Sequence, residues 1–194
     1  RFSVVDFDGS DDLIDLPATY GSDNISISTW VNYVDDGATG NIFDTRDAVS
    51  DGYVLQVNSS NQVAFKVNGT TNTYTGATFA NQWIHIVGTY NGTQIKIYIN
   101  GELVNTSNLT STVSTTTNAK IGRRNYNTAE PFQGSISSLA VYNTTKSAEE
   151  VYAIYQQGIT YDESSLSGLQ GYWRMGDDTS KAFPTIADSS SNSN

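Results

Sequence analysis

The sequence predicts an all-β protein: an antiparallel two-sheet jelly-roll β-sandwich with one short peripheral helix near residues 147–157. Three observations point to this fold. Many short segments alternate apolar and polar side chains, which is the period of a half-buried strand. Asn-Gly pairs at 91–92 and 100–101 supply the positive φ angles that tight hairpin turns require. The composition is rich in Ser, Thr, Asn, Gly and Tyr and poor in Leu, Lys and Glu, which disfavours helices.

The predicted strands follow one another with short polar connections. Residues 25–34 show the alternation most clearly, with Ile25, Ile27 and Val31 on one side. In chain order the expected strands are 3–7, 13–16, 25–34, 40–44, 52–57, 62–67, 72–77, a hairpin over 83–99, 102–105, 119–122 and 134–142. The segment 106–118 is rich in Ser, Thr and Asn, and we predict that it is a surface loop.

One helix is predicted over residues 147–157. Ser147 and Glu150 have the spacing of a capping box, in which each side chain accepts a hydrogen bond from the backbone of the other residue. An apolar stripe with helical spacing begins at Val151, and Gly158 supplies the stop. Because this helix follows nearly all the strands, it is expected at the edge of the sandwich.

Size, charge and cysteine content narrow the function. The chain has 194 residues, and we expect one sandwich domain over residues 1–168 with a tail at 169–194. The net charge of −10 opposes binding to nucleic acid and to anionic membrane surfaces. No apolar run is long enough for membrane insertion. Since the chain has no cysteine, it has neither a disulfide nor a thiolate metal site.

Four stretches together resemble the laminin-G-like domains of the concanavalin A-like lectin/glucanase superfamily. In chain order they are Asp-Phe-Asp-Gly-Ser-Asp-Asp-Leu-Ile-Asp-Leu at 6–16, Ser-Thr-Trp-Val at 28–31, Gln-Trp-Ile-His-Ile-Val-Gly-Thr-Tyr-Asn-Gly at 82–92, and Phe-Gln-Gly-Ser-Ile at 132–136 with the strand and helix that follow it. The resemblance implies a binding or assembly module of the type found in tandem in bacterial surface and phage virion proteins. It also implies an extracellular, cell-surface or virion-surface location.

The tail has a resemblance of its own. Leu-Gln-Gly-Tyr-Trp-Arg-Met-Gly-Asp at 169–177, followed by 186–192, is similar to the segment that usually precedes the Phe-Asp-Gly signature of such modules. We interpret the tail either as the start of a following module or as a strand that completes the same sandwich. In both cases residues 172–174 are expected to form a strand, paired within this chain or with a neighbouring copy.

An acidic turn near the N-terminus is a candidate site for one structural calcium ion. Asp8, Asp11 and Asp12 share a turn with Gly9, and calcium binds six to eight oxygens, chiefly carboxylates and carbonyls. The resemblance implies that such an ion is held against the closing strand, where related domains carry an acidic pair and this chain has serines, beginning with Ser137. The alternative is that these aspartates cap the turn and keep the surface soluble.

Aromatic and planar polar side chains near predicted loops are candidates for binding a sugar. The predicted ligand-binding residues are Tyr53, Tyr74, Arg123, Arg124, Asn125 and Tyr126. Aromatic faces and planar polar groups are the surfaces that sugars use. Two simpler explanations stay open, because aromatic residues are favoured in sheets and the arginine pair has the acidic turns as possible ionic partners.

The chain has few residues suited to catalysis. His85 is the only histidine, and the resemblance implies that it packs in the sheet rather than acting as a base. Neither a Gly-x-Ser-x-Gly elbow nor a Glu-x-Asp-x-x-Glu run is present. We therefore expect a non-enzymatic recognition or assembly module that contacts glycans or a cell surface through loops. Two alternatives stay open: a structural virion or filament subunit assembled by strand exchange between copies, and a polysaccharide-cleaving enzyme with paired acids in a groove.

Overall fold

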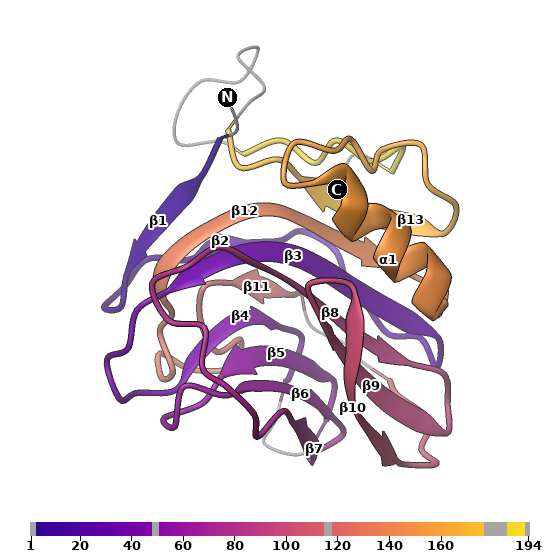
Figure 1. Cartoon of the computed structure of the whole chain (residues 1–194), viewed down its shortest axis with the longest axis horizontal. Helices are drawn as coiled ribbons and strands as arrows, with labels where there is room; N and C mark the ends of the chain where they lie inside the picture. Colours follow the sequence, from indigo (N-terminus) through magenta and orange to yellow (C-terminus); the bar gives the residue numbers. More distant parts are fainter. Residues whose placement is uncertain (1–2, 48–50, 115–117, 177–185, 193–194) are drawn as a thin grey trace.

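Strand pairing arranges the chain in two antiparallel sheets that face each other (Figure 1). The computed structural model describes residues 3–47, 51–114, 118–176 and 186–192. Sheet A contains, in spatial order, β1 (Val5–Asp8), β12 (Gln133–Tyr142), β3 (Ile25–Tyr33), β8 (Ile84–Tyr90), β9 (Gln94–Ile99) and β10 (Glu102–Asn108), with β13 (Leu169–Trp173) also paired to β12. Sheet B contains β2 (Ile14–Asp15), β11 (Lys120–Ile121), β4 (Gly40–Asp44), β5 (Tyr53–Val57), β6 (Val63–Val67) and β7 (Thr70–Thr73). The predicted two-sheet sandwich is confirmed.

The core lies between the sheets and is built by alternating side chains. Tyr53, Leu55 and Val57 of β5 point inward, where they meet Ile86 and Ile97 of sheet A, and all five are at most 5% exposed. Because side chains alternate along a strand, the even-numbered residues of β5 and β6 point to the outer face of sheet B. This alternation decides which polar residues of sheet B are available to a partner.

Two of the hairpin turns adopt the predicted conformation. Asn68-Gly69 and Asn100-Gly101 have φ angles of 45° and 78°, and of 51° and 83°, as two-residue turns between paired strands require. The hairpin between β8 and β9 was predicted to turn at Asn91-Gly92 and differs from that prediction. Tyr90 pairs with Ile95, so the turn is centred on Gly92-Thr93. There the Asn91 side chain accepts hydrogen bonds from the backbone of Thr93 and Gln94, so Asn91 acts as a cap.

Two predicted strand boundaries are wrong. The strand expected at 72–77 is β7, which begins directly after the Asn68-Gly69 turn and ends at Thr73. The strand expected at 102–105 extends to Asn108 in β10, so the first residues of the predicted loop 106–118 are strand. The side chain of Asn72 accounts for this extension, because it accepts a hydrogen bond from Ser107 and donates one to the Ile95 carbonyl. Residues 115–117 of that loop lie outside the described residues.

Helix α1 (Ala148–Gln157) lies across the outer face of sheet A (Figure 1). The predicted capping box is present: the Glu150 N–H donates to Ser147 Oγ at 3.2 Å, and the Ser147 N–H donates to Glu150 Oε2 at 2.8 Å. Val151 packs on Val87 and Tyr98 of the sheet. Among the described residues, no helix is long and apolar enough to cross a bilayer.

The three tryptophans differ in their burial. Trp173 is 1% exposed in the main core, whereas Trp30 and Trp83 are half-buried. Trp30 lies under α1 and stacks on Tyr155, with ring centroids 5.8 Å apart. Its position follows from the alternation in β3, which turns Trp30 to the face opposite Val31.

The tail strand β13 pairs with β12 of the same chain. β1 occupies one half of that edge of β12, through the pair Val5 and Ile136, and β13 occupies the other half, through Leu139 and Trp173. The strand expected at 172–174 thus exists and ends at Trp173. Beyond it, residues 186–192 return beside β13, where the Tyr172 N–H donates to Asp188 Oδ1 at 2.7 Å. Residues 177–185 and 193–194 of the tail lie outside the described residues.

Candidate functional site

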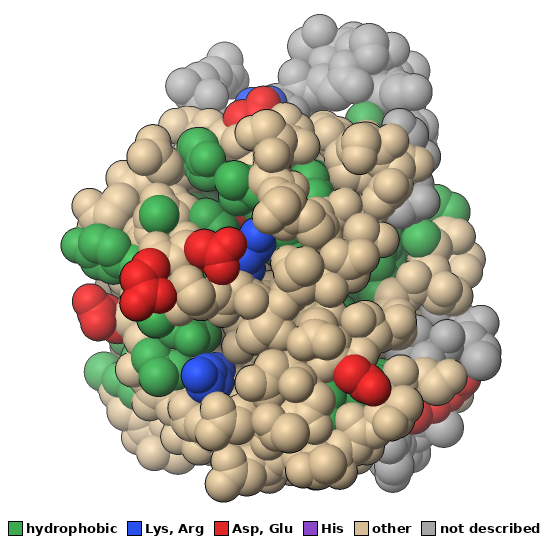
Figure 2. Space-filling model, turned by 90° about the vertical axis from the view of Figure 1, so that its right-hand side faces the viewer, with side chains coloured by type: hydrophobic (Ala, Val, Ile, Leu, Met, Phe, Trp, Pro, Cys, Tyr) green, Lys and Arg blue, Asp and Glu red, His purple; other side chains and the backbone are tan. Residues whose placement is uncertain are grey.

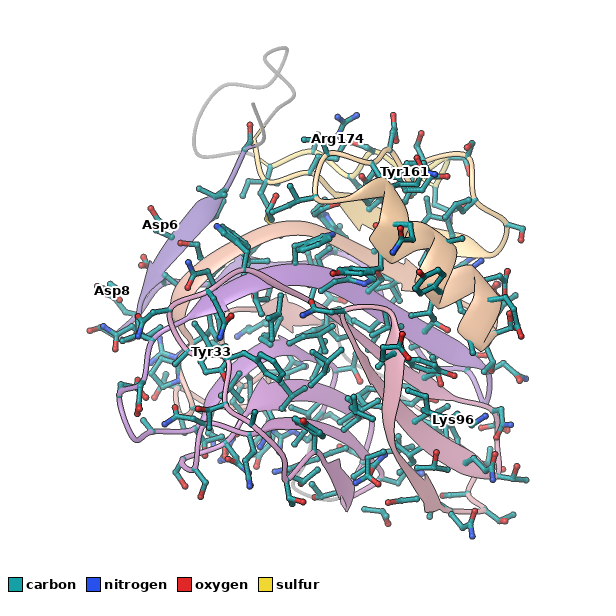
Figure 3. The ribbon with its side chains drawn as sticks, viewed as in Figure 1. Asp6, Asp8, Tyr33, Lys96, Tyr161 and Arg174 are labelled. Carbon is teal, nitrogen blue, oxygen red and sulfur yellow. The ribbon has the colours of Figure 1, made fainter. Side chains whose placement is uncertain are left out.

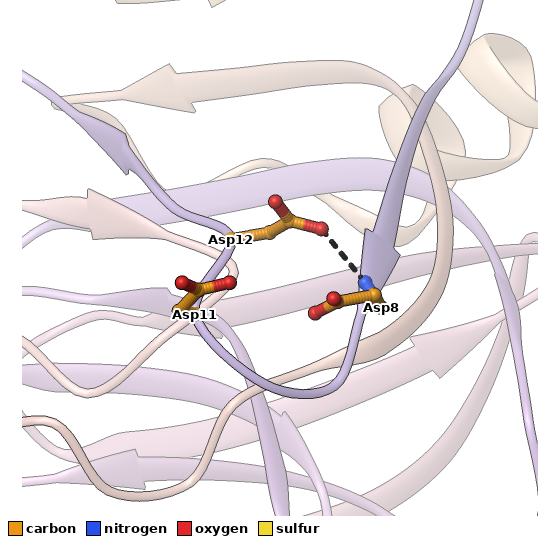
Figure 4. Close-up of side chains that lie close together, drawn as sticks. All are labelled: Asp8, Asp11 and Asp12. Carbon is orange, nitrogen blue, oxygen red and sulfur yellow. Dashed lines mark hydrogen bonds between the residues drawn. The ribbon is translucent and has the colours of Figure 1, made fainter.

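The three aspartates of the N-terminal turn lie together (Figure 4). Asp8, Asp11 and Asp12 each offer a carboxylate oxygen, and these oxygens lie within 4.8 Å of one another on the exposed surface. Two of these side chains also shape the turn, because Asp12 Oδ2 accepts the Asp8 N–H at 2.9 Å and Asp8 Oδ1 accepts the Ser10 N–H at 2.7 Å. Gly9 allows the turn to close, with a φ of 78°.

The three carboxylates supply only part of the oxygen ligands that a calcium ion needs. Three carboxylates have the right chemistry for a hard cation, but calcium needs six to eight oxygens, so water would have to supply several. Ser137 does not join this group. Asp8 pairs with Gln133 of β12, four residues away from Ser137, whose Oγ instead donates to the Ser3 carbonyl at 2.8 Å. The sequence pattern placed Ser137 in the correct strand but could not show its register.

A calcium titration tests the acidic turn. If the turn binds calcium, the ion at 100 times its Kd adds about 2.7 kcal/mol to the free energy of unfolding. In a domain of this size, each kcal/mol raises the melting temperature by about 2–4 °C. We expect Asp11→Asn to abolish the rise, and the exposed Glu102→Gln to retain it. If the wild type melts at the same temperature with calcium and with a chelator, the turn does not bind calcium and the aspartates only cap the turn.

The outer face of sheet B carries a second group of charged residues, at the loop that follows β11. We call Asp44, Arg46, Arg124, Tyr126 and Glu130 the arginine cluster. Arg46 donates to Asp44 Oδ2 at 2.6 Å and to Glu130 Oε2 at 3.1 Å, and Arg124 pairs with the same Glu130 carboxylate. The Tyr126 ring lies 5.5 Å from the Arg46 guanidinium and 5.4 Å from that of Arg124, which are cation–π distances.

Burial and nearby positive charge have opposite effects on the pKa values of the two acids in the arginine cluster. Burial raises the pKa of Asp44, and hydrogen bonds from Arg46 offset part of that rise. Burial also works against ionisation of Glu130, but hydrogen bonds from Arg124 and Arg46 hold its pKa below the ordinary value. Glu130 therefore serves as an anion that fixes both guanidinium groups.

The structure brings together only part of the predicted ligand-binding set. Arg124 and Tyr126 belong to the arginine cluster, and Asn125 joins it by donating to the Arg46 carbonyl at 2.9 Å. Arg123 points the other way, toward the acidic turn, where its Nη1 lies 3.5 Å from the Asp11 carbonyl. Asp44 and Arg46 were missed because they come from a segment far from Arg124 in the chain, and Glu130 was missed although it follows Arg124 in the same loop. The short spacing of Asp44 and Arg46 was the one available signal.

The two other predicted tyrosines are not part of a surface site. Tyr53 is fully buried, its ring stacks 6.1 Å from Phe65, and its hydroxyl donates to the Ser22 carbonyl. Tyr74 is half-buried and stacks on Phe79, with centroids 6.1 Å apart. The prediction for Tyr53 is wrong because the residue lies inside β5, at an inward position, rather than in a loop.

Polar groups with unused hydrogen-bonding capacity border the arginine cluster. Asn41 and Gln56 are opposed in β4 and β5, and among the described residues the side-chain oxygen of neither accepts a hydrogen bond, although both are buried. Lys66 of β6 is half-buried, and its ammonium group forms no ion pair with a described residue. Burial lowers the pKa of Lys66. We call Asn41, Gln56 and Lys66 the polar strip.

His85 lies under α1, on the outer side of sheet A. It is fully buried, and its Nε2 lies 2.9 Å from Ser28 Oγ. Its ring is 5.2 Å from that of Trp30 and 6.2 Å from that of Tyr155. Burial lowers the pKa of His85 to about 3, so the ring is neutral at pH 7. These contacts give His85 a packing role between the sheet and the helix.

Comparison with known proteins agrees with this architecture. The sequence model of a family described as the concanavalin A-like lectin/glucanases superfamily matches residues 8–152. No curated protein matches the chain in sequence.

Among solved structures, a heptameric pentraxin from Limulus polyphemus has a TM-score of 0.66 and 16% identity over 78% of this chain and 81% of that one. A Bacteroides ovatus protein has a TM-score of 0.74 and 16% identity over 97% of this chain and 56% of that one, so the chain spans little more than half of it. The CBM40 of a Ruminococcus gnavus sialidase, bound to α2,3-sialyllactose, has a TM-score of 0.65 and 17% identity over 79% of this chain and 96% of that one. At these identities the likeness concerns the fold.

Proposed function

The chain belongs to the concanavalin A-like lectin/glucanase superfamily, and from this premise we propose that it is a non-catalytic module that binds glycans. We place the module in an extracellular, cell-surface or virion-surface protein. The binding surface in this proposal is the outer face of sheet B, formed by the polar strip and the arginine cluster.

The two outer faces of the sandwich are unequally covered. Helix α1 and the segment between α1 and β13 lie over the outer face of sheet A, whereas no helix among the described residues lies over sheet B (Figure 1). A partner can therefore reach the outer face of sheet A only beside α1, whereas it can reach the outer face of sheet B directly. Rigid strands hold the outward side chains of sheet B in place, so little ordering entropy is lost when a ligand binds.

The polar strip is the observation that carries the proposal. Buried polar atoms are nearly always hydrogen-bonded, so two unpartnered amide oxygens on adjacent strands need an explanation. Sugar hydroxyl groups are donors that fit such acceptors, and the Lys66 ammonium is a donor for sugar oxygens. Because the Asn41 and Gln56 oxygens lie below the surface, the ligand reaches them through a bridging water or after the Lys66 side chain swings aside.

Charge favours an acidic sugar. In the polar strip and arginine cluster, three basic side chains, Arg46, Arg124 and Lys66, outnumber the two acids, Asp44 and Glu130. The whole chain carries a net charge of −10, so a group of side chains with one positive charge in excess stands out from the overall composition. A glycan with a carboxylate is the ligand class that this balance favours. The sialyllactose bound to the similar CBM40 structure supports the same class.

Calorimetric titration with sialyllactose and with lactose tests this proposal. We expect sialyllactose to bind more tightly than lactose, and Lys66→Met to weaken its binding about tenfold, because a charged hydrogen bond is lost while the aliphatic stem is kept. Arg174→Met, which removes a basic side chain that pairs with Asp162, is the matched control and should bind sialyllactose like the wild type. Equal affinity of Lys66→Met and the wild type would reject sheet B as the binding face. New reducing ends from a polysaccharide panel would instead indicate an enzyme.

A further inference from the structure

A groove on the opposite sheet has no role in the function proposed above. It has a volume of about 250 Å³ and lies between the start of α1 and the outer faces of β8, β9 and β10. Its lining includes Thr89, Gln94, Lys96 and Leu103 from the sheet and Ser147 from the helix start. At about 30 Å³ per water molecule, the groove holds roughly eight waters or one small ring.

The floor of this groove contains a buried hydroxyl group without a partner. Thr89 is 1% exposed, and among the described residues its Oγ1 makes no hydrogen bond. Lys96 lies directly opposite Thr89 in the pairing of β8 and β9. The Lys96 ammonium forms no ion pair with a described residue. A hydroxyl that can both donate and accept therefore adjoins a free cationic donor.

The walls of the groove add an apolar surface beside these polar groups. Leu103 is 47% exposed, which is unusual for a large apolar side chain in this protein, and Tyr98 lies next to it in the lining. Figure 3 shows Lys96 at the right-hand side of the sandwich, below α1. A small site with an apolar wall and a few placed polar groups is typical of ligand pockets.

Charge at the groove is balanced, in contrast to the outer face of sheet B. Lys146 borders the groove, but its ammonium group already donates to the Ser167 carbonyl at 2.9 Å and lies 3.6 Å from Glu150. Burial raises the pKa of Tyr98, and the negative charge of nearby Glu149 raises it further. The N–H groups of Ser147 and Glu150 are used by the capping box. Figure 2 shows that charged side chains of both signs are few on this side of the molecule.

We infer that the groove beside α1 is a second binding site, which takes one neutral sugar ring through Thr89 and Lys96. Hydroxyl groups of the ring pair with the Lys96 ammonium directly and with the buried Thr89 hydroxyl through a bridging water, and the C–H face of the ring lies against Leu103. The balanced charge gives no preference for a carboxylate, so this site differs from sheet B in the sugar it selects. The inference extends the proposed glycan-binding function, and it places two sites on opposite faces of one module.

Amide-detected NMR titration of the whole chain with glucose, galactose, mannose and N-acetylglucosamine tests this inference. We expect at least one of them to shift the backbone signals of Thr89, Gln94 and Lys96 in the millimolar range. Thr89→Val removes the hydroxyl and keeps the shape, so it should weaken binding about tenfold. It should leave the melting temperature unchanged or higher, because a buried unpartnered hydroxyl is lost. Lys96→Met should weaken binding to a similar extent.

The outcomes separate this groove from the site on sheet B. Lys66→Met should leave the groove signals and their shifts unchanged, because Lys66 is on the other sheet. If none of the four sugars shifts the groove signals while sialyllactose still binds, the second site is rejected and the proposed function stands. The groove is also rejected if Thr89→Val lowers the melting temperature and leaves sugar binding unchanged, since the hydroxyl would then have a structural partner.

Discussion

Replacing Trp173 by alanine is expected to lower the free energy of unfolding by about 3–5 kcal/mol, which is the usual cost of truncating a buried tryptophan. Trp173 is 1% exposed, and its ring packs edge-on against Tyr20 with centroids 6.1 Å apart. It is supplied by the tail strand β13, so its loss tests whether the tail is part of the core. Denaturation in guanidinium chloride, followed by circular dichroism, measures the change.

Two measurements make this test decisive. Tyr152→Ala removes an aromatic residue that is 47% exposed on α1, and it should change the free energy of unfolding by no more than about 0.5 kcal/mol. Light scattering of the wild type should report a monomer, because β13 pairs within the chain. A loss below about 1 kcal/mol for Trp173→Ala would contradict a role for the tail in the core. A stable oligomer would support strand exchange between copies.

Replacing Glu163 by glutamine is expected to remove a dependence of stability on pH. Glu163, in the segment that follows α1, is 2% exposed, and its Oε2 accepts a hydrogen bond from the Tyr142 hydroxyl at 2.5 Å. Burial raises the pKa of Glu163 to about 7, from an ordinary value of 4.5, against the opposing effects of that hydrogen bond and of the Lys146 charge. The folded protein therefore prefers the protonated carboxyl group.

The sign of the effect follows from that preference. A carboxyl group whose pKa is raised on folding contributes its full stability below its unfolded pKa, and that contribution is lost as the pH rises through the folded pKa. Between about pH 4.5 and pH 8 the wild type should lose about 3 kcal/mol through Glu163 alone. Other groups act in the opposite direction, among them His85 and Glu130, whose pKa values are lowered on folding. The difference between wild type and variant cancels their contribution.

The measurement is the free energy of unfolding of wild type and Glu163→Gln at pH 5 and at pH 8. We expect the wild type to lose more stability than the variant over this interval, by about 2–3 kcal/mol. The exposed Glu102→Gln should follow the wild type. Parallel curves for wild type and Glu163→Gln would mean that the carboxyl group is solvated or paired in solution, in contradiction to its burial here.

Local features of the fold were predictable because they depend on neighbouring residues. The Asn100-Gly101 turn needs two positive φ angles, and the capping box needs only Ser147 and Glu150 three positions apart. Alternation along 25–34 likewise identified β3. In contrast, the extension of β10 depends on Asn72, which donates a hydrogen bond to β9 and accepts one from Ser107 of β10, and a local pattern does not contain these contacts.

The candidate sites also combine features that the sequence predicted with contacts that it could not predict. Arg124 and Tyr126 were found because they lie two positions apart in a loop, but their partner Arg46 comes from a distant segment of the chain. Ser137 was assigned to the acidic turn although the register of β1 on β12 carries it away. Thr89 belongs to the family-like stretch at 82–92, but the sequence did not single it out as a site residue, because its significance lies in the hydrogen bond that its hydroxyl lacks.

The sequence by itself determined the all-β class, the Asn100-Gly101 turn and the single capped helix, because each of these is encoded by residues within about ten positions of one another. It also determined the family, through four short stretches spread along the chain. The tertiary structure alone decided which side chains share a face and which hydrogen-bonding groups stay unused. It did so through strand register and alternation, since a shift of one residue moves every side chain of a strand to the other side of the sheet. That is why Tyr53 lies in the core while Gln56, in the same strand, faces the proposed glycan.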